Sequence, residues 1–266
     1  MLSLVIINIR VTSKKENSLR KDAMETRLVN ERLKEINDSK DLFFSIISHD
    51  LRAPLGTVSA FLDYFTDESE HFSKEEIKEA VASMNKYTHE VYALLENLLT
   101  WSRIQSGSIK VSLKHESISE RVCKNVELYS AQAMQKEIKL TCNVNDDIVL
   151  DFDPDMINTL LRNLINNAIK FTPRGGQILI NAVSKSDCVE VTVQDSGKGM
   201  SETTLKDLFR IDKKQNSCLG TEGEKGSGLG LILCKHFVEC HNGTFSISSS
   251  RGKGCKVMFT IPFKQS

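Results

Sequence analysis

The sequence predicts a two-domain protein, in which a long-helix hairpin forms a dimeric four-helix bundle and an α+β sandwich follows. Residues 24–65 and 73–98 place apolar side chains at alternating three- and four-residue steps, the rhythm of packed helices. After residue 106, strand-like and helix-like segments are mixed without the regular βαβα alternation of a doubly wound fold. We expect an N-terminal tail at 1–23, the helical hairpin at 24–106 and the second domain at 107–266.

The composition is that of an ordinary soluble chain with no charge bias. Of 266 residues, 40% are hydrophobic, and 35 Lys and Arg balance 35 Asp and Glu. Because a neutral chain has no net field to attract a polyanion, we expect no nucleic-acid partner. The seven cysteines contain no C-x-x-C pair, which argues against a disulfide framework and favours a reducing cytosol. A cluster with no common zinc spacing is expected to pack rather than bind metal: Cys234, His236, Cys240 and His241.

The apolar run from Leu2 to Ile9 is too short to span a bilayer, which takes about 20 residues. Arg10, Lys14 and Lys15 follow it, as basic residues follow the cytoplasmic end of a membrane span. Two interpretations stay open. The run is either the inner end of a span that begins upstream, which would anchor the chain to a membrane, or a frayed terminus.

The helical hairpin is predicted to be the dimerisation unit. The second helix begins at Ser73, with Glu76 three residues later as in a capping box, and residues 67–72 form the turn before it. Because two helices bury too little apolar surface alone, we expect a second copy of the chain to complete the bundle. The apolar stripe comprises Val29, Leu33, Ile36, Phe43, Ile47, Leu51, Leu55, Val58, Leu62 and Phe65, then Ile77, Val81, Met84, Val91, Leu95 and Leu98.

In the second domain, β-branched content and period-two alternation predict strands that helices cover on one side. Asp153 and Pro154 form a typical helix start, with an N-cap carboxylate before a proline. The predicted strands span residues 138–144, 148–152, 177–183, 188–193, 243–249 and 255–262, and the helices lie near 118–136, 154–170 and 228–241.

His49 is a candidate nucleophile on the first long helix. It lies two residues before Leu51, about 160 degrees from the centre of the stripe, so its imidazole faces outward. Asp50 adjoins it and can accept its proton, and the neutral, nucleophilic form of histidine predominates at cytosolic pH. Pro54 and Gly56 would loosen the helix just beyond. The alternative is a solvated surface histidine.

The helix predicted at 154–170 presents a polar row. Asn163, Asn167 and Lys170 share one face by their spacing, and apolar residues on the opposite face can anchor the helix on a sheet. An amide oxygen is a suitable ligand for a magnesium ion held mostly by nucleotide phosphates, and Lys170 would neutralise phosphate charge. The alternative is a row that merely faces solvent. The anchoring residues are Leu161, Leu164, Ile165 and Ala168.

Two glycine turns could complete a nucleotide site. Asp195 follows a predicted strand and could accept the exocyclic amine of adenine, although a plain turn has the same pattern. Gly226, Gly228 and Gly230 open a predicted helix, where free backbone N–H groups can meet a polyphosphate. The polar stretch 201–225 between the two turns is long enough to form a lid.

Four motifs occur in order along the chain: S-H-D-L-R-A-P-L at 48–55, N-L-I-N-N-A-I-K-F-T-P at 163–173, D-S-G-K-G-M at 195–200 and G-S-G-L-G-L at 226–231. They resemble the H, N, G1 and G2 boxes of bacterial sensor histidine kinases from two-component systems, and the resemblance covers about residues 40–263. It implies a HisKA-type dimerisation domain followed by a Bergerat-fold ATPase domain. The implied enzyme is a protein-histidine kinase that uses ATP and Mg²⁺.

The resemblance also assigns roles by position. It implies that His49 is the phosphoacceptor, that Asp50 is the adjacent acid/base and that Asn167 holds magnesium. The residues implied to bind ATP are Asn163, Asn167, Lys170, Phe171, Asp195, Gly197, Gly199, Gly226, Gly228 and Gly230. The implied partners are a second copy of the chain and the receiver domain of a response regulator, whose aspartate takes the phosphoryl group. The implied location is the cytoplasmic portion of an inner-membrane sensor.

Three departures from the family pattern limit these expectations. Ala53 stands where many relatives have Thr or Asn to orient water, so phosphatase activity is not expected. Phe209 has no second phenylalanine at the short spacing usual in the family, so we expect the closed lid to be anchored loosely or in a different way. Asn163 stands where chaperone-type and mismatch-repair relatives of the ATP-binding fold carry a Glu base, so we expect poor activation of water for simple ATP hydrolysis. Two other functions stay open: an ATP-binding dimeric scaffold without phosphoryl transfer, and a hydrolytic ATPase of the same fold.

Overall fold

The computed structural model divides into two compact units, residues 1–48 and 49–266, and each is described by itself. In the first unit, the described residues lie singly or in pairs between 21 and 34 and are helical. In the second unit, the structure describes residues 51–66 without Ala53, 73–106, 108–144, 147–209, 219–224 and 228–264. The N-terminal apolar run, most of the first predicted helix and the turn at 67–72 lie outside the described residues. Within the described part, no helix is long and apolar enough to cross a membrane.

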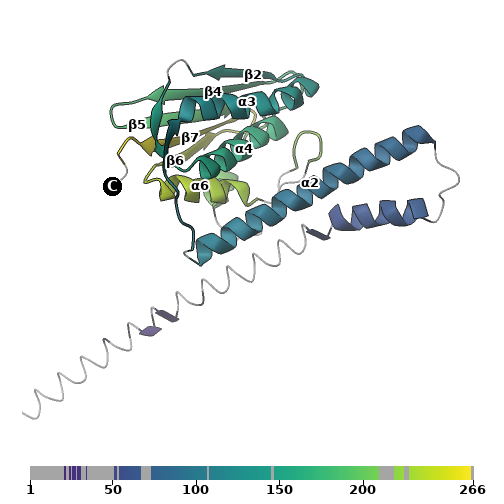
Figure 1. The fold of residues 1–266 in the computed structure, drawn as a ribbon, viewed down its shortest axis with the longest axis horizontal. Coiled ribbons are helices and arrows are strands. Elements are labelled where there is room, and N and C mark those ends of the chain that lie inside the picture. The colour runs from purple at the N-terminus through teal and green to yellow at the C-terminus, as the bar shows by residue number, and fades with distance from the viewer. Residues whose placement is uncertain are drawn as a thin grey trace, which may run out of the picture. The chain divides into compact units, whose positions relative to one another are not determined.

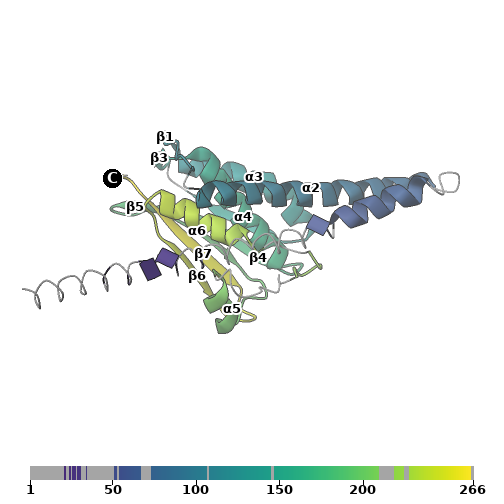
Figure 2. The same ribbon diagram turned by 90° about the horizontal axis from the view of Figure 1, so that it is seen from below.

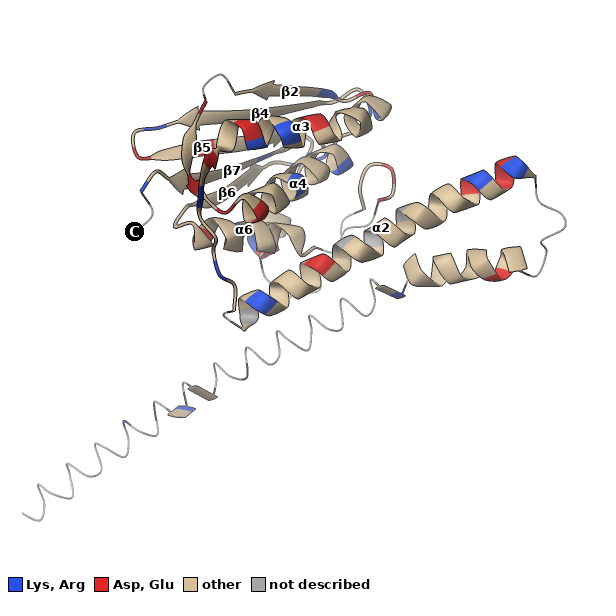
Figure 3. Cartoon of the chain, viewed as in Figure 1, with Lys and Arg blue, Asp and Glu red and all other residues tan. Residues whose placement is uncertain are grey.

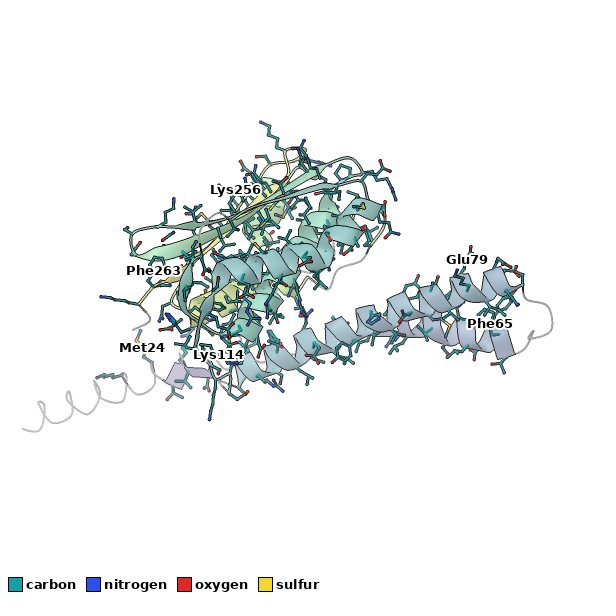
Figure 4. The ribbon with its side chains drawn as sticks, turned by 45° about the horizontal axis from the view of Figure 1, so that its top comes forward. Met24, Phe65, Glu79, Lys114, Lys256 and Phe263 are labelled. Carbon is teal, nitrogen blue, oxygen red and sulfur yellow. The ribbon has the colours of Figure 1, made fainter. Side chains whose placement is uncertain are left out.

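The second unit begins with a helical hairpin. Residues 54–66 are helical and lie beside α2 (Lys74–Gln105) in both views (Figures 1 and 2). Phe65 and Glu79 lie at the same end of this hairpin, as expected for antiparallel helices (Figure 4). The predicted capping box is confirmed, because Ser73 Oγ accepts the N–H of Glu76 at 3.2 Å and the Glu76 carboxylate accepts the N–H of Ser73 at 2.9 Å.

Beyond α2 the chain forms a sheet covered by helices on one face, as predicted. Five strands of the described part have the order β2-β4-β5-β7-β6, in which β2 runs parallel to β4 and the other neighbours are antiparallel. Helices α3, α4 and α6 lie together on one side of it (Figures 1 and 2). The elements are β1 (Lys114–Ser117), α3 (Ile118–Gln135), β2 (Lys139–Asn143), β3 (Val149–Phe152), α4 (Pro154–Phe171), β4 (Gln177–Ser184), β5 (Cys188–Asp195), α5 (Glu202–Asp207), α6 (Gly230–Cys240), β6 (Phe245–Ser249) and β7 (Cys255–Pro262).

Helix α4 contacts both α3 and α6 and is the central helix of this layer. One of its faces is almost entirely apolar and is buried. The anchoring residues that the sequence predicts are all buried, at 0 to 3% exposure: Leu161, Leu164, Ile165 and Ala168. Burying such side chains stabilises the domain by roughly 1.5–3 kcal/mol each. The burial also fixes the rotation of the helix about its axis, so Asn163 and Asn167 lie at the margin of the core and are half-buried.

Asp153 caps α4 and ties its first turn to the chain that leaves α2. Its Oδ1 accepts the N–H groups of Asp155 and Met156 at 3.0 and 3.1 Å. Its Oδ2 accepts the N–H of Ser112 at 2.8 Å. Asp153 is 5% exposed, so water cannot readily replace these bonds.

We therefore expect Asp153→Ala to lower the free energy of unfolding by about 2 kcal/mol or more, because it removes an N-cap and leaves the N–H of Ser112 without its acceptor. Urea unfolding followed by circular dichroism measures this loss. Asp153→Asn keeps an accepting oxygen for the cap and should lose less. Equal losses in the two variants would contradict the capping role.

Candidate functional site

The polar side of α4 faces the start of α6. Asn163 Nδ2 donates to the carbonyl oxygen of Thr159 at 2.9 Å, which fixes the orientation of its amide. A Cβ at Gly230 would lie 2.6 Å from Asn163 Oδ1, so a larger residue there would have to displace the Asn163 amide. Lys170 lies one turn beyond Asn167 and is 8% exposed. The predicted row is thus present, and it meets the glycine turn that the sequence predicts to bind phosphate.

We expect Gly230→Ala to be destabilising by about 1–3 kcal/mol, because the added methyl must displace Asn163. Thermal unfolding measures the effect. Gly56→Ala is the matched control, since a Cβ at Gly56 meets nothing within 4 Å on its helix. That control should gain stability, as alanine favours helices over glycine. A Gly230→Ala variant that also gains stability would show that α6 and α4 are not in close contact here.

Asp195 ends β5 and presents a buried carboxylate. Its Oδ1 accepts the N–H groups of Gly197 at 2.8 Å and Cys255 at 3.2 Å. Burial raises the pKa of the Asp195 carboxyl, and these two hydrogen bonds offset the rise only in part. Because both donors reach the same oxygen, they leave Oδ2 for another donor, such as the exocyclic amine of a purine.

The turn after Asp195 needs glycine at two positions because it is pressed against the end of α4 and the β6–β7 loop. A Cβ at Gly197 would lie 2.3 Å from the carbonyl oxygen of Phe171. Gly199 has a φ of +62°, and a Cβ there would lie 2.0 Å from the carbonyl oxygen of Ser250. The close approach places Asp195 beside Phe171, so the candidate adenine and phosphate residues share one site.

Two ammonium groups lie over the ring of Phe171. The Nζ atoms of Lys170 and Lys198 are 5.1 and 4.9 Å from the ring centroid. Lys198 Nζ also donates to the carbonyl oxygen of Leu219. Lys198 is not among the predicted site residues, although it occupies the variable position within D-S-G-K-G-M. Together these lysines give the end of α4 a positive charge suited to an anionic ligand.

The structure describes nine of the predicted site residues and leaves three outside the described part. Asn163, Asn167, Lys170 and Phe171 lie on α4, Asp195, Gly197 and Gly199 lie at the end of β5 and its turn, and Gly228 and Gly230 lie at the start of α6. Gly228 has a φ of +69°, which glycine adopts readily. His49, Asp50 and Gly226 lie outside the described residues, as do Ala53 and residues 210–218 of the predicted lid.

Phe209, the aromatic residue before the undescribed part of the predicted lid, is held by the sheet. Its ring stacks edge-on against Phe245 of β6, with centroids 6.1 Å apart, and Lys235 Nζ lies 5.0 Å from its centroid. A cavity of about 200 Å³ lies next to it, between Trp101 of α2 and Ile232 of α6. This cavity is lined by none of the predicted nucleotide residues, so it is separate from the candidate site.

Two members of the cysteine and histidine cluster at 234–241 lie in the core, whereas His236 and Cys240 are half-buried. Cys234 is fully buried. His241 is also fully buried, and its Nε2 accepts the N–H of Asp153 at 2.9 Å. Its Nδ1 lies 2.6 Å from the carbonyl oxygen of Phe237 and therefore carries the proton. His241 thus joins the end of α6 to the start of α4.

Two family models match the chain. Residues 39–107 match the His Kinase A (phospho-acceptor) domain. Residues 152–265 match the histidine kinase-, DNA gyrase B- and HSP90-like ATPase family. Together they cover more than half of the chain, and the second match contains α4, β5 and α6, which carry the candidate site.

Proteins similar to this chain in sequence or in structure are named as histidine kinases. A sensor-like histidine kinase of Rhizobium meliloti (strain 1021) is 32% identical over 85% of this chain and 43% of its own length. The histidine kinase AdeS of Acinetobacter baumannii superposes with a TM-score of 0.63 at 19% identity, covering 81% of this chain and 98% of that one. The histidine kinase ThkA, solved in complex with the response regulator TrrA, gives a TM-score of 0.64 at 21% identity over 89% of this chain and 64% of that one. The chain spans less than half the length of the curated relatives that it matches first.

Proposed function

Because this chain belongs to the sensor histidine kinase family, we propose that it binds ATP on its second domain and transfers the γ-phosphoryl group to His49. The observation that carries the proposal is the convergence of three elements. The buried carboxylate of Asp195, the polar face of α4 and the glycine-rich start of α6 meet within contact distance, through Gly197 at Phe171 and Gly230 at Asn163. Such a site offers an acceptor for a purine amine beside donors for a polyphosphate.

Each side chain has a role that its surroundings support. Asp195 Oδ2 accepts the adenine amine, and Gly199 lets the turn approach the ring. Phe171 lines the site, while Asn163 and Lys170 contact the phosphates. Gly226, Gly228 and Gly230 present backbone N–H groups to the polyphosphate. Asn167 offers an amide oxygen to Mg²⁺, which when bound would neutralise charge on the transferred phosphoryl group.

The transfer itself needs positioning more than covalent chemistry from the protein. A ring nitrogen of His49 forms a bond to the γ-phosphorus as the bond from that phosphorus to the bridging oxygen of ADP breaks. Asp50 accepts the proton that the imidazole gives up. The structure does not describe His49 and Asp50, so their roles rest on the match of residues 39–107 to the phospho-acceptor domain.

We further propose that the chain is a homodimer with domains at 24–106 and 107–266. Along the hairpin, apolar side chains remain exposed although they follow the predicted stripe, and Figure 3 shows charged residues gathered at the start of α2. A second hairpin would cover these side chains and form the four-helix bundle. The exposed stripe residues, between 40 and 56% exposed, are Leu55, Leu62, Ile77, Val81 and Leu95.

The partner that receives the phosphoryl group is proposed to be an aspartate of a response-regulator receiver domain. The support is the structure of ThkA, a similar histidine kinase that was solved with a response regulator. Membrane anchoring at or upstream of the N-terminus, and a place at the cytoplasmic side of the inner membrane, are proposed from the apolar run followed by basic residues.

Incubation with γ-labelled ATP and Mg²⁺ tests the function. We expect label on the protein that acid removes and alkali does not, as for a phosphorus–nitrogen bond. ATP binding without label would favour a nucleotide-controlled scaffold, and free phosphate without labelled protein would favour a hydrolytic ATPase.

The metal role of Asn167 predicts a change in magnesium dependence. Asn167→Ala removes an amide oxygen from the site, so we expect the Mg²⁺ concentration for half-maximal labelling to rise about 10-fold or more. A Mg²⁺ titration at fixed ATP measures it. Asn166→Ala is the matched control, because Asn166 is exposed and lies one residue away on another face of α4. Equal magnesium dependence in both variants would contradict the assignment of Asn167 as a magnesium ligand.

A further inference from the structure

Three cations from separate parts of the domain converge on the short segment Leu219–Glu224, which directly precedes the glycine turn at 226–230. Two of the contacts are to carboxylates and one is to a backbone carbonyl. They are Arg174 Nε to Glu222 Oε1 at 2.9 Å, Lys136 Nζ to Glu224 Oε1 at 3.1 Å, and Lys198 Nζ to the carbonyl oxygen of Leu219.

Lys136 differs from the other two cations because it is buried. It follows the last residue of α3, and its side chain is 6% exposed, against 55% for Arg174. Its Nζ donates to the carbonyl oxygens of Ile169 and Lys170 at 3.0 and 3.3 Å, besides Glu224. An ammonium has three N–H groups, so these acceptors satisfy it. The carbonyls belong to the last turn of α4, where the helix dipole favours a cation.

Glu224 is held as tightly as Lys136. Its Oε2 accepts the N–H of Glu222 at 2.9 Å, and its backbone carbonyl accepts the N–H of Gly220 at 2.8 Å. Burial alone would raise the pKa of the Glu224 carboxyl, but backbone hydrogen bonds and Lys136 outweigh it and hold the pKa below its ordinary value. The Glu224 carboxyl is therefore ionised at neutral pH, and its hydrogen bonds hold it in place.

A second set of bonds joins the same segment to the same end of α4. The N–H and hydroxyl of Thr221 both donate to the carbonyl oxygen of Lys170, at 3.0 and 3.2 Å. The hydroxyl also lies 3.0 Å from the carbonyl oxygen of Thr172. The backbone carbonyl of Lys170 thus accepts hydrogen bonds from both Lys136 and Thr221. The side chain of the same residue is proposed to contact the phosphates.

We propose that Lys136 is a positioning residue for the triphosphate of ATP. By holding Glu224 against the last turn of α4, it fixes the end of the segment Leu219–Glu224, from which the chain continues to Gly228 and Gly230. Glycines have no side chains to fix their own turn, so ordering it for phosphate binding costs conformational entropy that a fixed leading segment reduces. The inference rests on the proposed function, because it concerns the same ATP site.

A general stabilising role alone would not explain the arrangement. A buried ion pair contributes little net stability, because the cost of removing two charges from water offsets their attraction. The pair does, however, fix geometry, because the acceptors of the Lys136 ammonium belong to the last turn of α4 and to Glu224 in the segment Leu219–Glu224. The specific consequence is a difference between ligands, since adenosine uses the Asp195 side of the site and only ATP uses the glycine turn.

The test compares Lys136→Met with wild type for two ligands. We expect the dissociation constant for ATP, measured by calorimetry in the presence of Mg²⁺, to rise about 10-fold or more. The dissociation constant for adenosine, measured by NMR titration, should change less than about twofold. In labelling assays the KM for ATP should rise more than kcat falls. Lys136→Arg, which keeps the charge, should restore part of the ATP affinity.

Arg174→Met is the matched control, since it removes an exposed cation that contacts Glu222 of the same segment and should change ATP affinity less than about twofold. If Lys136→Met does not fold, Glu224→Gln gives the same comparison with its shape preserved. Equal weakening of ATP and adenosine, or no weakening of ATP, would overturn the positioning role. These outcomes are differences in dissociation constant between the variant and wild type. They differ from failure of the proposed function, in which the wild-type protein itself binds no ATP or takes no label.

Discussion

His49→Gln is expected to reduce acid-labile labelling from γ-labelled ATP at least about a thousandfold, because it removes the nucleophile of the proposed transfer. Glutamine is close to histidine in size but its amide does not attack phosphorus. The proposed ATP site lies more than a hundred residues further along the chain, from Asn163 to Gly230. ATP affinity should therefore stay within about twofold of wild type, and calorimetry on the same sample checks it.

The matched control is His115→Gln. His115 is an exposed histidine beside a carboxylate, with Nδ1 2.8 Å from Asp151 Oδ1 and a side chain that is 72% exposed. It lies on β1, outside the four motifs, so its replacement should leave labelling unchanged. Loss of label from His115→Gln with retention in His49→Gln would move the phosphoacceptor to the second domain and overturn the assignment of His49.

The elements that local chemistry determines could be predicted from the sequence. The capping box at Ser73 and the cap at Asp153 are short-range patterns, and both hold in the structure. β1 was missed because its sequence, K-H-E-S, is polar, and it is a strand only because it pairs with β3. The same pairing shows that β3 belongs to a separate two-stranded ribbon rather than to the main sheet. Such pairings depend on residues distant in sequence, which local patterns do not report.

The residues of the candidate site also fall into those that local sequence patterns predict and those that only distant contacts place. Asp195 and the row on α4 were predictable, because a strand end and a helical spacing place them. Lys136 was not, because its partners at Lys170 and Glu224 lie 34 and 88 residues away, and nothing near it in sequence marks it as part of a site. Lys198 could have been found, since it lies inside a motif whose glycines bring it onto Phe171.

Asp195→Asn is expected to weaken ATP binding about 100-fold or more. Asparagine can keep Oδ1 as the acceptor for the N–H groups of Gly197 and Cys255, which places its NH₂ group where Oδ2 was. A donor would then face the adenine amine, so an acceptor is lost and two donors are left opposed in a buried site. Calorimetry with ATP measures the loss, and labelling should fall with it. Glu190→Gln, on the same strand, should leave the affinity unchanged.

The same substitution should not destabilise the free protein at pH 7. Burial raises the pKa of the Asp195 carboxyl, so its ionised form costs stability in the folded state once the pH exceeds the folded-state pKa. Neutral asparagine carries no such cost, and the variant should melt at or above the wild-type temperature at pH 7. The gap should close as the pH falls towards 3.8, the ordinary pKa of the group, because wild-type Asp195 then becomes neutral in both states. A variant that binds no ATP yet melts higher would show that this carboxylate serves the ligand at the expense of the fold, whereas a lower melting temperature at pH 7 would show that its charge stabilises the turn.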